Sequence, residues 1–104
     1  MAEIRLCEVA EIEEDQPLQV TVDGHEPFAV YNVEGDIYVS DDFCTHGKAS
    51  LSDEGDLDGF TIVCTWHDGA FDIRTGEIKS RPCTEPLKVY PVTIRDGEVF
   101  ITVE

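Results

Sequence analysis

Positive charge is scarce in this chain of 104 residues, which has 7 Lys and Arg against 23 Asp and Glu and a formal net charge of −16. A surface this acidic repels phosphate backbones and anionic lipids, so nucleic-acid and membrane binding are disfavoured and a basic protein partner is favoured. At this length the chain can bury one core of its own but cannot carry a second substrate-binding domain. Any function therefore has to fit on a single small domain.

Targeting and membrane signals are also missing. No apolar run approaches the roughly 20 residues of a membrane helix, and the N-terminus has neither the basic start nor the apolar stretch of a signal peptide. We therefore expect a cytoplasmic protein. In a reducing compartment the four cysteines (Cys7, Cys44, Cys64 and Cys83) are expected to be metal ligands or free thiols rather than disulfides.

Sustained helical periodicity is absent, and the sequence instead has short runs of β-branched and aromatic residues between Gly-containing turns. The predicted strands are Leu18 to Val22, Phe28 to Val33, Ile37 to Ser40, Thr61 to Val63, Leu87 to Ile94, and Glu98 to Val103. The last two are expected to form a hairpin around Asp96 and Gly97. The only helical candidate is one acidic turn within residues 9–15, which Pro17 ends. The sequence therefore predicts an all-β fold, either a sandwich or a small barrel.

The middle of the chain differs from its two flanks. Residues 41–86 have fewer alternating apolar positions and contain five of the eight glycines. We expect a loop-rich subdomain over residues 41–86, inserted into a base sheet built from residues 1–40 and 87–104. Because such loops bury little apolar surface, a bound metal centre is expected to order them.

Two Cys/His pairs lie in this middle segment. Cys44 and His46 are separated by one residue, seventeen residues follow, and Cys64 and His67 are separated by two residues. Two thiolates and two imidazoles suit several centres. Structural zinc commonly takes both sulfurs from one knuckle, whereas a binuclear iron centre can take one sulfur and one nitrogen from each loop. A blue-copper site needs a weak axial ligand, often Met, and the only Met is Met1. His25 has no partner in sequence and is interpreted as a packing or surface residue.

The pattern C-x-H, seventeen residues, C-x₂-H resembles the Rieske [2Fe-2S] signature. The whole chain is similar to the Rieske ferredoxins of bacterial aromatic-ring-hydroxylating (naphthalene/biphenyl dioxygenase-like) oxygenase systems. This similarity runs from a Cys-Glu-Val-Ala opening strand to the terminal hairpin and includes CTWHDGAFD at residues 64–72. It implies the Rieske fold, an antiparallel β-sandwich or barrel-like base with an inserted cluster-binding subdomain.

The resemblance also implies a role for each residue of the two pairs. Cys44 and Cys64 would hold the inner iron of one [2Fe-2S] cluster, and His46 and His67 the outer iron. Six further residues would lie around the cluster, namely Thr45, Gly47, Trp66, Gly69, Phe71 and Pro82. Glycines beside the ligands would let backbone N–H groups approach the sulfides, although ordinary turn chemistry explains them equally well. Trp66 would either shield the cluster from water or lie at the tip where a partner docks, and its large apolar area favours shielding. Cys7 and Cys83 are expected to be free thiols.

Departures from the respiratory-complex branch of the family point to a low reduction potential. That branch has a disulfide cysteine in each loop, where this chain has Ala49 and Trp66. It also has Ser and Tyr hydroxyls that donate to the sulfurs, where this chain has Gly69 and Phe71. Without donors that stabilise the added electron, the midpoint potential is expected near the low end of the Rieske range, about −150 mV.

These features imply an electron carrier and not an enzyme. The sequence has no G-x-G-x-x-G fingerprint, and His25 alone cannot build a 2-His-1-carboxylate iron site once His46 and His67 are assigned. The family implies an NAD(P)H-dependent flavoprotein reductase as donor and a terminal Rieske non-haem iron oxygenase of aromatic-compound degradation as acceptor. Two alternatives stay open, a Rieske-like small subunit of an assimilatory nitrite reductase and a structural zinc module for protein interaction. Colour separates the last of these, because a zinc protein is colourless.

Overall fold

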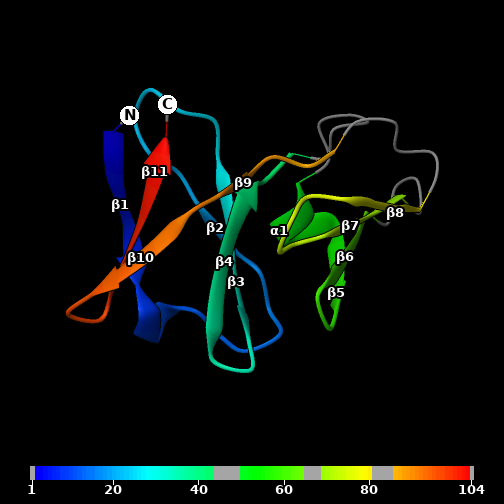
Figure 1. Ribbon diagram of the computed structural model, residues 1–104, viewed down its shortest axis with the longest axis horizontal. Coiled ribbons are helices and arrows are strands. Elements are labelled where there is room, and N and C mark those ends of the chain that lie inside the picture. Colours follow the sequence, from blue (N-terminus) through cyan, green and yellow to red (C-terminus); the bar gives the residue numbers. More distant parts are fainter. Residues whose placement is uncertain (1, 44–49, 65–68, 81–85, 104) are drawn as a thin grey trace.

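Figure 1 shows a molecule of short strands with very little helix. The computed structural model describes residues 2–43, 50–64, 69–80 and 86–103. Three antiparallel sheets are formed, with strand orders β1-β11-β10, β2-β3-β4-β9 and β5-β6-β7-β8. The strands are β1 (Ala2–Glu8), β2 (Leu18–Val20), β3 (Phe28–Val33), β4 (Asp36–Asp41), β5 (Gly55–Asp58), β6 (Thr61–Cys64), β7 (Gly69–Asp72), β8 (Ile78–Ser80), β9 (Val89–Tyr90), β10 (Val92–Arg95) and β11 (Glu98–Val103). The predicted all-β class is confirmed.

The predicted C-terminal hairpin is present as β10 and β11, with Val92 opposite Ile101. The strand expected from Leu87 to Ile94 is divided at Pro91 into β9 and β10. Proline has no N–H to donate to a ladder, so a strand commonly ends or changes partner there. On one side of Pro91, β9 pairs with β4, and on the other side β10 pairs with β11. The two strands on either side of Pro91 therefore link the β2-β3-β4-β9 sheet to the β1-β11-β10 sheet.

The opening strand lies earlier than expected. Only Cys7 and Glu8 of the Cys-Glu-Val-Ala segment lie in a strand, because β1 ends at Glu8 and a 3₁₀ turn, η1 (Val9–Glu11), follows. Within β1 the register with β11 shifts between Arg5 and Cys7. This irregularity leaves the consecutive residues Leu6 and Cys7 both buried, which breaks the alternation by which a strand is recognised in sequence.

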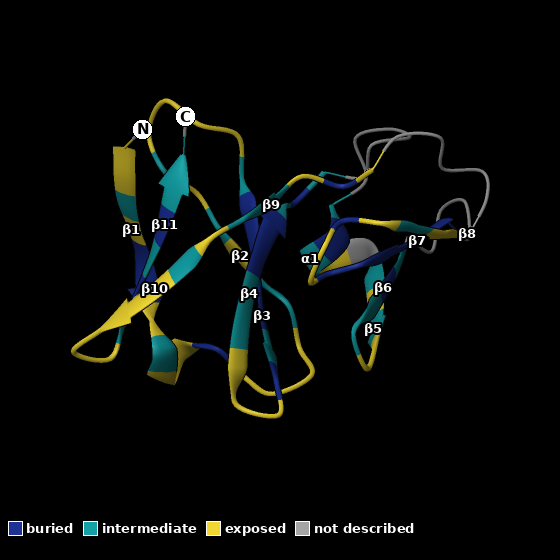
Figure 2. Ribbon diagram, in the orientation of Figure 1, coloured by how far each residue is buried: buried dark blue, intermediate teal, exposed yellow. Residues whose placement is uncertain are grey.

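Strand β3 lies between two hydrophobic cores, and five of its six residues are buried. Tyr31 and Val33 belong to one core and Phe28 and Val30 to the other, as the two-residue period of a strand requires. The first core is completed by Ala29, Leu51, Ile62, Phe71, Ile73 and Leu87, and the second by Leu6, Cys7, Ile12, Val39, Val99 and Ile101. Figure 2 shows that β7 is buried along its whole length. The first core therefore joins the middle segment to β3.

The middle segment has more regular structure than its sequence indicates. Strands β5 to β8 form a four-stranded antiparallel sheet between residues 55 and 80, and Ile62 and Phe71 are each 0% exposed. Burying such side chains contributes about 1.5–3 kcal/mol each. The expectation that this segment orders only around a metal is therefore too strong, because its strands share a core with Tyr31 and Val33.

Helices are short in the described part of the chain. The helical turn expected within residues 9–15 is η1, which is three residues long. A second helix, α1 (Leu51–Glu54), was not expected, and the Ser50 side chain caps it by accepting a hydrogen bond from the Asp53 N–H. No helix among the described residues is long and apolar enough to span a bilayer.

Candidate metal centre

Most of the predicted ligands lie outside the residues that the structure describes. Only the backbone of Cys64 is described, and it is the last residue of β6. Range 44–49 contains Cys44, Thr45, His46 and Gly47, and range 65–68 contains Trp66 and His67. Range 81–85 contains Pro82 and Cys83. The structure describes none of these three ranges. Gly69 and Phe71 are both described. The geometry of the site is therefore defined by the residues that flank these three ranges.

The flanking residues of two ranges meet at one end of the β5–β8 sheet (Figure 1). Cys64 lies opposite both Gly55 and Gly69, so residues 65–68 connect two directly paired positions. Ala70, the next residue of β7, is paired with Ser80, and range 81–85 follows Ser80. The second Cys/His segment and range 81–85, which contains Pro82 and Cys83, thus leave the sheet from neighbouring positions.

The first Cys/His segment returns to the same end of the sheet through α1. An antiparallel bridge joins Phe43 to Ser50 and closes range 44–49. The chain then turns through α1 to Gly55, where a Cβ would overlap the Leu51 carbonyl oxygen and lie 2.9 Å from Cδ1 of Ile62. Gly55 has a φ of −88°, so no left-handed turn requires a glycine at this position. Its glycine is needed instead for close packing of α1 on β6.

The third range is closed by Gly76 and Leu87. The Leu87 N–H donates to the Gly76 carbonyl oxygen at 2.9 Å, and the Gly76 N–H donates to the Asp72 carbonyl oxygen at 2.7 Å. Gly76 has a φ of +81°, and a Cβ there would overlap the Leu87 carbonyl oxygen. The Asp72 carboxylate accepts bonds from Arg74, which hold the pKa of Asp72 below its usual value. Residues 72–76 thus form a rigid turn on which residue 87 is fixed.

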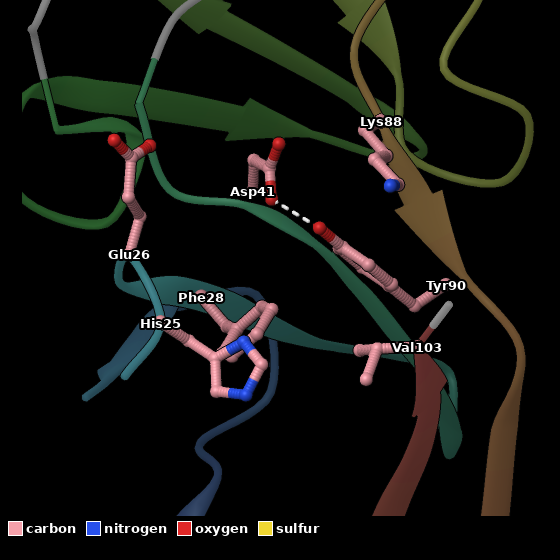
Figure 3. Close-up of a pocket in the computed structure, with 7 residues that line it drawn as sticks. All are labelled: His25, Glu26, Phe28, Asp41, Lys88, Tyr90 and Val103. Carbon is pink, nitrogen blue, oxygen red and sulfur yellow. Dashed lines mark hydrogen bonds between the residues drawn. The ribbon is translucent and has the colours of Figure 1, made fainter. Parts of the chain in front are cut away.

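A surface hollow of about 250 Å³ lies beside the residues that precede the first Cys/His segment (Figure 3). In it, the Tyr90 hydroxyl donates to Oδ1 of Asp41 at 2.5 Å, and the Asp41 N–H donates to the Lys88 carbonyl oxygen at 3.0 Å. Burial, followed by the bond to Asp41, raises the pKa of Tyr90, so its hydroxyl stays a donor. The edge of the Tyr90 ring contacts Phe28, with 5.2 Å between ring centroids. These contacts fix the end of β4.

The described side chains by themselves do not form a metal site. No group of three or more His, Cys, Asp or Glu residues in the described ranges could hold a metal. His25 is exposed and lies against Phe28, with 6.0 Å between ring centroids, as a packing or surface residue would. Cys7 is a free, buried thiol, as expected, and burial raises its pKa to about 11.

The two described residues of the predicted surroundings carry no hydroxyl. Gly69 is buried and pairs with Cys64, and Phe71 is 0% exposed within the first core. Phe71 was identified in sequence by its place near the ligands, but its contacts are those of a core residue. Sequence reasoning missed Asp41 and Tyr90, since no local pattern signals a hydrogen bond between residues 49 positions apart.

Comparison with known proteins agrees with this geometry. The family model described as the Rieske [2Fe-2S] domain matches residues 2–91. The ferredoxin component of the p-cumate 2,3-dioxygenase system of Pseudomonas putida is 42% identical over 100 residues, which are 96% of this chain and 85% of that protein. The solved Sphingomonas yanoikuyae B1 ferredoxin has a TM-score of 0.93 and 47% identity, covering 99% of this chain and 100% of that one.

A second solved structure includes a partner. A chain in the complex of reduced oxygenase and oxidized ferredoxin in carbazole 1,9a-dioxygenase has a TM-score of 0.88 and 42% identity, covering 95% of this chain and 91% of that one. With a match over most of its length, the chain belongs to the Rieske [2Fe-2S] domain family. Its cofactor is one Rieske-type [2Fe-2S] cluster.

Proposed function

We propose that this protein is a one-electron carrier, the ferredoxin component of a bacterial oxygenase system that acts on aromatic compounds. The p-cumate 2,3-dioxygenase component and the carbazole 1,9a-dioxygenase complex support this function. Such a protein passes electrons and transforms no organic substrate itself. Its acceptor is a terminal Rieske non-haem iron oxygenase, and we infer an NAD(P)H-dependent flavoprotein reductase as its donor. Because that reductase draws on the cellular NAD(P)H pool, we place the protein in the cytoplasm.

For the cluster we propose four ligands, Cys44, His46, Cys64 and His67. This assignment rests on the pairing of Cys64 with both Gly55 and Gly69 in the β5–β8 sheet. Gly55 lies where the chain re-enters the sheet after the first Cys/His segment, and Cys64 and Gly69 flank range 65–68. The pairing therefore brings both segments to one end of the sheet. Two thiolates and two imidazoles are the donor set of a Rieske centre. When bound, this cluster takes up and releases one electron, with the imidazole-bound iron as the site of reduction.

The chain's own residues hold the segments that carry these ligands. The Phe43–Ser50 bridge, the Cys64–Gly69 pair and the Gly76–Leu87 hydrogen bond each close one range of the chain. We propose residues 41–86 as the cluster-binding subdomain on a base of residues 1–40 and 87–104. The β5–β8 sheet supports this division, while the shared core explains why the two parts would not move independently. A rigid frame suits electron transfer, because little reorganisation accompanies the change in charge.

Charge on the described surface supports transient docking to basic partners. Four of the five described cationic side chains pair with acids of the same chain: Arg5 with Glu98, Arg74 with Asp72, Lys79 with Glu77, and Arg95 with Glu3. The fifth, Lys88, lies 5.4 Å from the Tyr90 ring centroid. Since acids outnumber bases by 23 to 7, the chain carries a large excess of negative charge. The field of this charge would steer a positively charged partner surface and would weaken as salt rises.

Stopped-flow reduction by a flavoprotein reductase, followed by oxidation with a terminal oxygenase, tests the proposed function. We expect the visible absorbance to report one-electron reduction of the protein and then its reoxidation. The second-order rate constant for reduction by the reductase should fall several-fold between low and physiological salt. A reduced protein that no aromatic-ring oxygenase reoxidises would contradict the proposed acceptor. A salt-independent rate would remove electrostatic steering but leave the carrier function standing.

A further inference from the structure

A buried carboxylate lies just before the first Cys/His segment. Asp42 is 0% exposed and stands two positions before Cys44. It is neither a proposed ligand nor an apolar core residue. Because a buried carboxylate without partners destabilises a fold strongly, its hydrogen bonds indicate why it is there.

The carboxylate of Asp42 joins the two ends of the first segment. Its Oδ2 accepts from the Ser50 hydroxyl at 2.6 Å, and its Oδ1 accepts from the Ser52 N–H at 2.8 Å. Ser50 and Ser52 follow range 44–49, whereas Asp42 precedes it. Oδ2 also accepts from the Gln19 side-chain amide in β2 at 2.7 Å. One side chain therefore ties together the start of the segment, its end and the base sheet.

The backbone of Asp42 reinforces this connection. Its N–H donates to the Pro27 carbonyl oxygen at 3.0 Å, and its carbonyl oxygen accepts from the Leu51 N–H at 2.6 Å. Leu51 is the first residue of α1 and is 0% exposed in the first core. The Leu51 contact therefore anchors the end of the segment in the first core. All three groups that bond to the Asp42 carboxylate are donors, as a carboxylate acceptor favours.

Water reaches only the outer side of this arrangement. A hollow of about 270 Å³ is lined by Gln19, Ser50 and Ser52, together with Pro17, Leu18 and Asp53. Removing the Gln19 side chain would extend the hollow toward Oδ2, and a water could then replace the lost donor. Removing the carboxylate itself would take the shared acceptor away from all three donors at a position that is 0% exposed. The two kinds of change therefore differ in severity.

We propose that Asp42 is a positioning residue for the cluster, because its carboxylate fixes both ends of the segment that carries Cys44 and His46. This inference rests on the proposed assignment of those two residues as ligands. Because protein contacts fix both ends of the segment, we expect iron to be released slowly from the loaded protein. Asp42 contributes to this by geometry and does not bind iron.

Two variants test the role of Asp42. Asp42→Asn keeps the size of the side chain and the bond to Ser52, but it places an NH₂ group against two donors. The double variant Gln19→Ala, Ser50→Ala leaves Asp42 intact and removes both side-chain donors to Oδ2. Cys7→Ser is the control for general destabilisation. Cys7 is also buried, at 4% exposed, but it lies in β1 and belongs to the second core.

The measurements are the rate at which a chelator removes iron from the folded, loaded protein, and the EPR line shape of the reduced cluster. We expect iron release about tenfold faster in Asp42→Asn, equivalent to about 1.4 kcal/mol, and about threefold faster in the double variant. Cys7→Ser is expected to stay within about twofold of the wild type and to keep its EPR line shape, because a loss of stability alone does not alter the segment. Asp42→Asn is expected to broaden the EPR line.

The proposal is overturned if Asp42→Asn and the double variant both fold and release iron at the wild-type rate with an unchanged EPR line. It is also overturned if Cys7→Ser accelerates release as much as Asp42→Asn does, since the effect would then be general destabilisation. Cys44→Ser and His46→Ala separate the two levels of the argument. If they keep the wild-type cluster spectrum, the ligand assignment fails. If they lose it while Asp42→Asn behaves as the wild type, only the role of Asp42 fails.

Discussion

Replacing Gly76 with alanine is the sharpest perturbation of the frame around the cluster. Gly76 has a φ of +81°, and a Cβ there would overlap the Leu87 carbonyl oxygen. An alanine must therefore adopt a left-handed conformation and also displace residue 87. Leu87 is 2% exposed in the first core and follows range 81–85. Its displacement therefore affects both the core and the place where the chain re-enters the described fold after range 81–85.

The expected cost is the sum of two separable contributions. The left-handed backbone costs an alanine about 1–2 kcal/mol. Moving Leu87 weakens its 2.9 Å bond to the Gly76 carbonyl oxygen, which contributes about 1 kcal/mol, with a further ~1 kcal/mol from disturbed packing. Gly76→Ala should therefore destabilise the protein by about 3–4 kcal/mol. Gly35→Ala is the matched control, because Gly35 has a φ of +88° and nothing lies within 4 Å of its Cβ position.

Native-state hydrogen exchange combined with urea unfolding measures both contributions. Gly35→Ala should show only the backbone cost, whereas Gly76→Ala should also lose protection at the Leu87 amide. If the two variants agree to within about 0.5 kcal/mol and the Leu87 amide stays protected, close packing of residues 76 and 87 does not stabilise the protein.

Three further predictions concern single groups. The stability advantage of the wild type over Asp72→Asn should be present near neutral pH and disappear as the pH falls through the lowered pKa of Asp72, so urea midpoints that differ equally at pH 7 and at strongly acidic pH would contradict it. Cys7, whose pKa is raised to about 11, should resist alkylation in the folded protein at mildly alkaline pH and react on unfolding, as mass spectrometry would show; rapid labelling of the folded protein would count against burial of the thiol. The midpoint potential should lie near −150 mV, since neither Gly69 nor Phe71 offers a hydroxyl, and voltammetry giving more than about +100 mV would refute that reasoning.

The sequence predicts those parts of the fold in which local pattern and tertiary environment agree. The β10–β11 hairpin is one such part, because Val99 and Ile101 alternate with more exposed residues and Asp96 and Gly97 both adopt positive φ. Strand β3 was also expected, but its position between two cores was not, since a continuous apolar run does not distinguish one buried face from two.

Features that depend on distant residues escaped prediction. Strands β5, β7 and β8 have four residues or fewer and contain Gly, Asp or Lys, so no period is visible within them. The partners of Asp42 lie in two separate parts of the chain, at Gln19 and at Ser50 and Ser52. Conversely, the order and spacing of the Cys/His pairs predict a Rieske [2Fe-2S] cluster without any knowledge of distant contacts. The match to the Rieske [2Fe-2S] domain family agrees with that prediction.

The most direct test of the cluster assignment is pulsed EPR of the reduced protein, which detects nitrogen nuclei bound to the paramagnetic iron centre. If His46 and His67 are ligands, two strongly coupled histidine nitrogens should be present, and His46→Ala or His67→Ala should abolish this two-nitrogen pattern. A reduced cluster with no coupled nitrogen, or a colourless zinc protein without an EPR signal, would contradict the assignment.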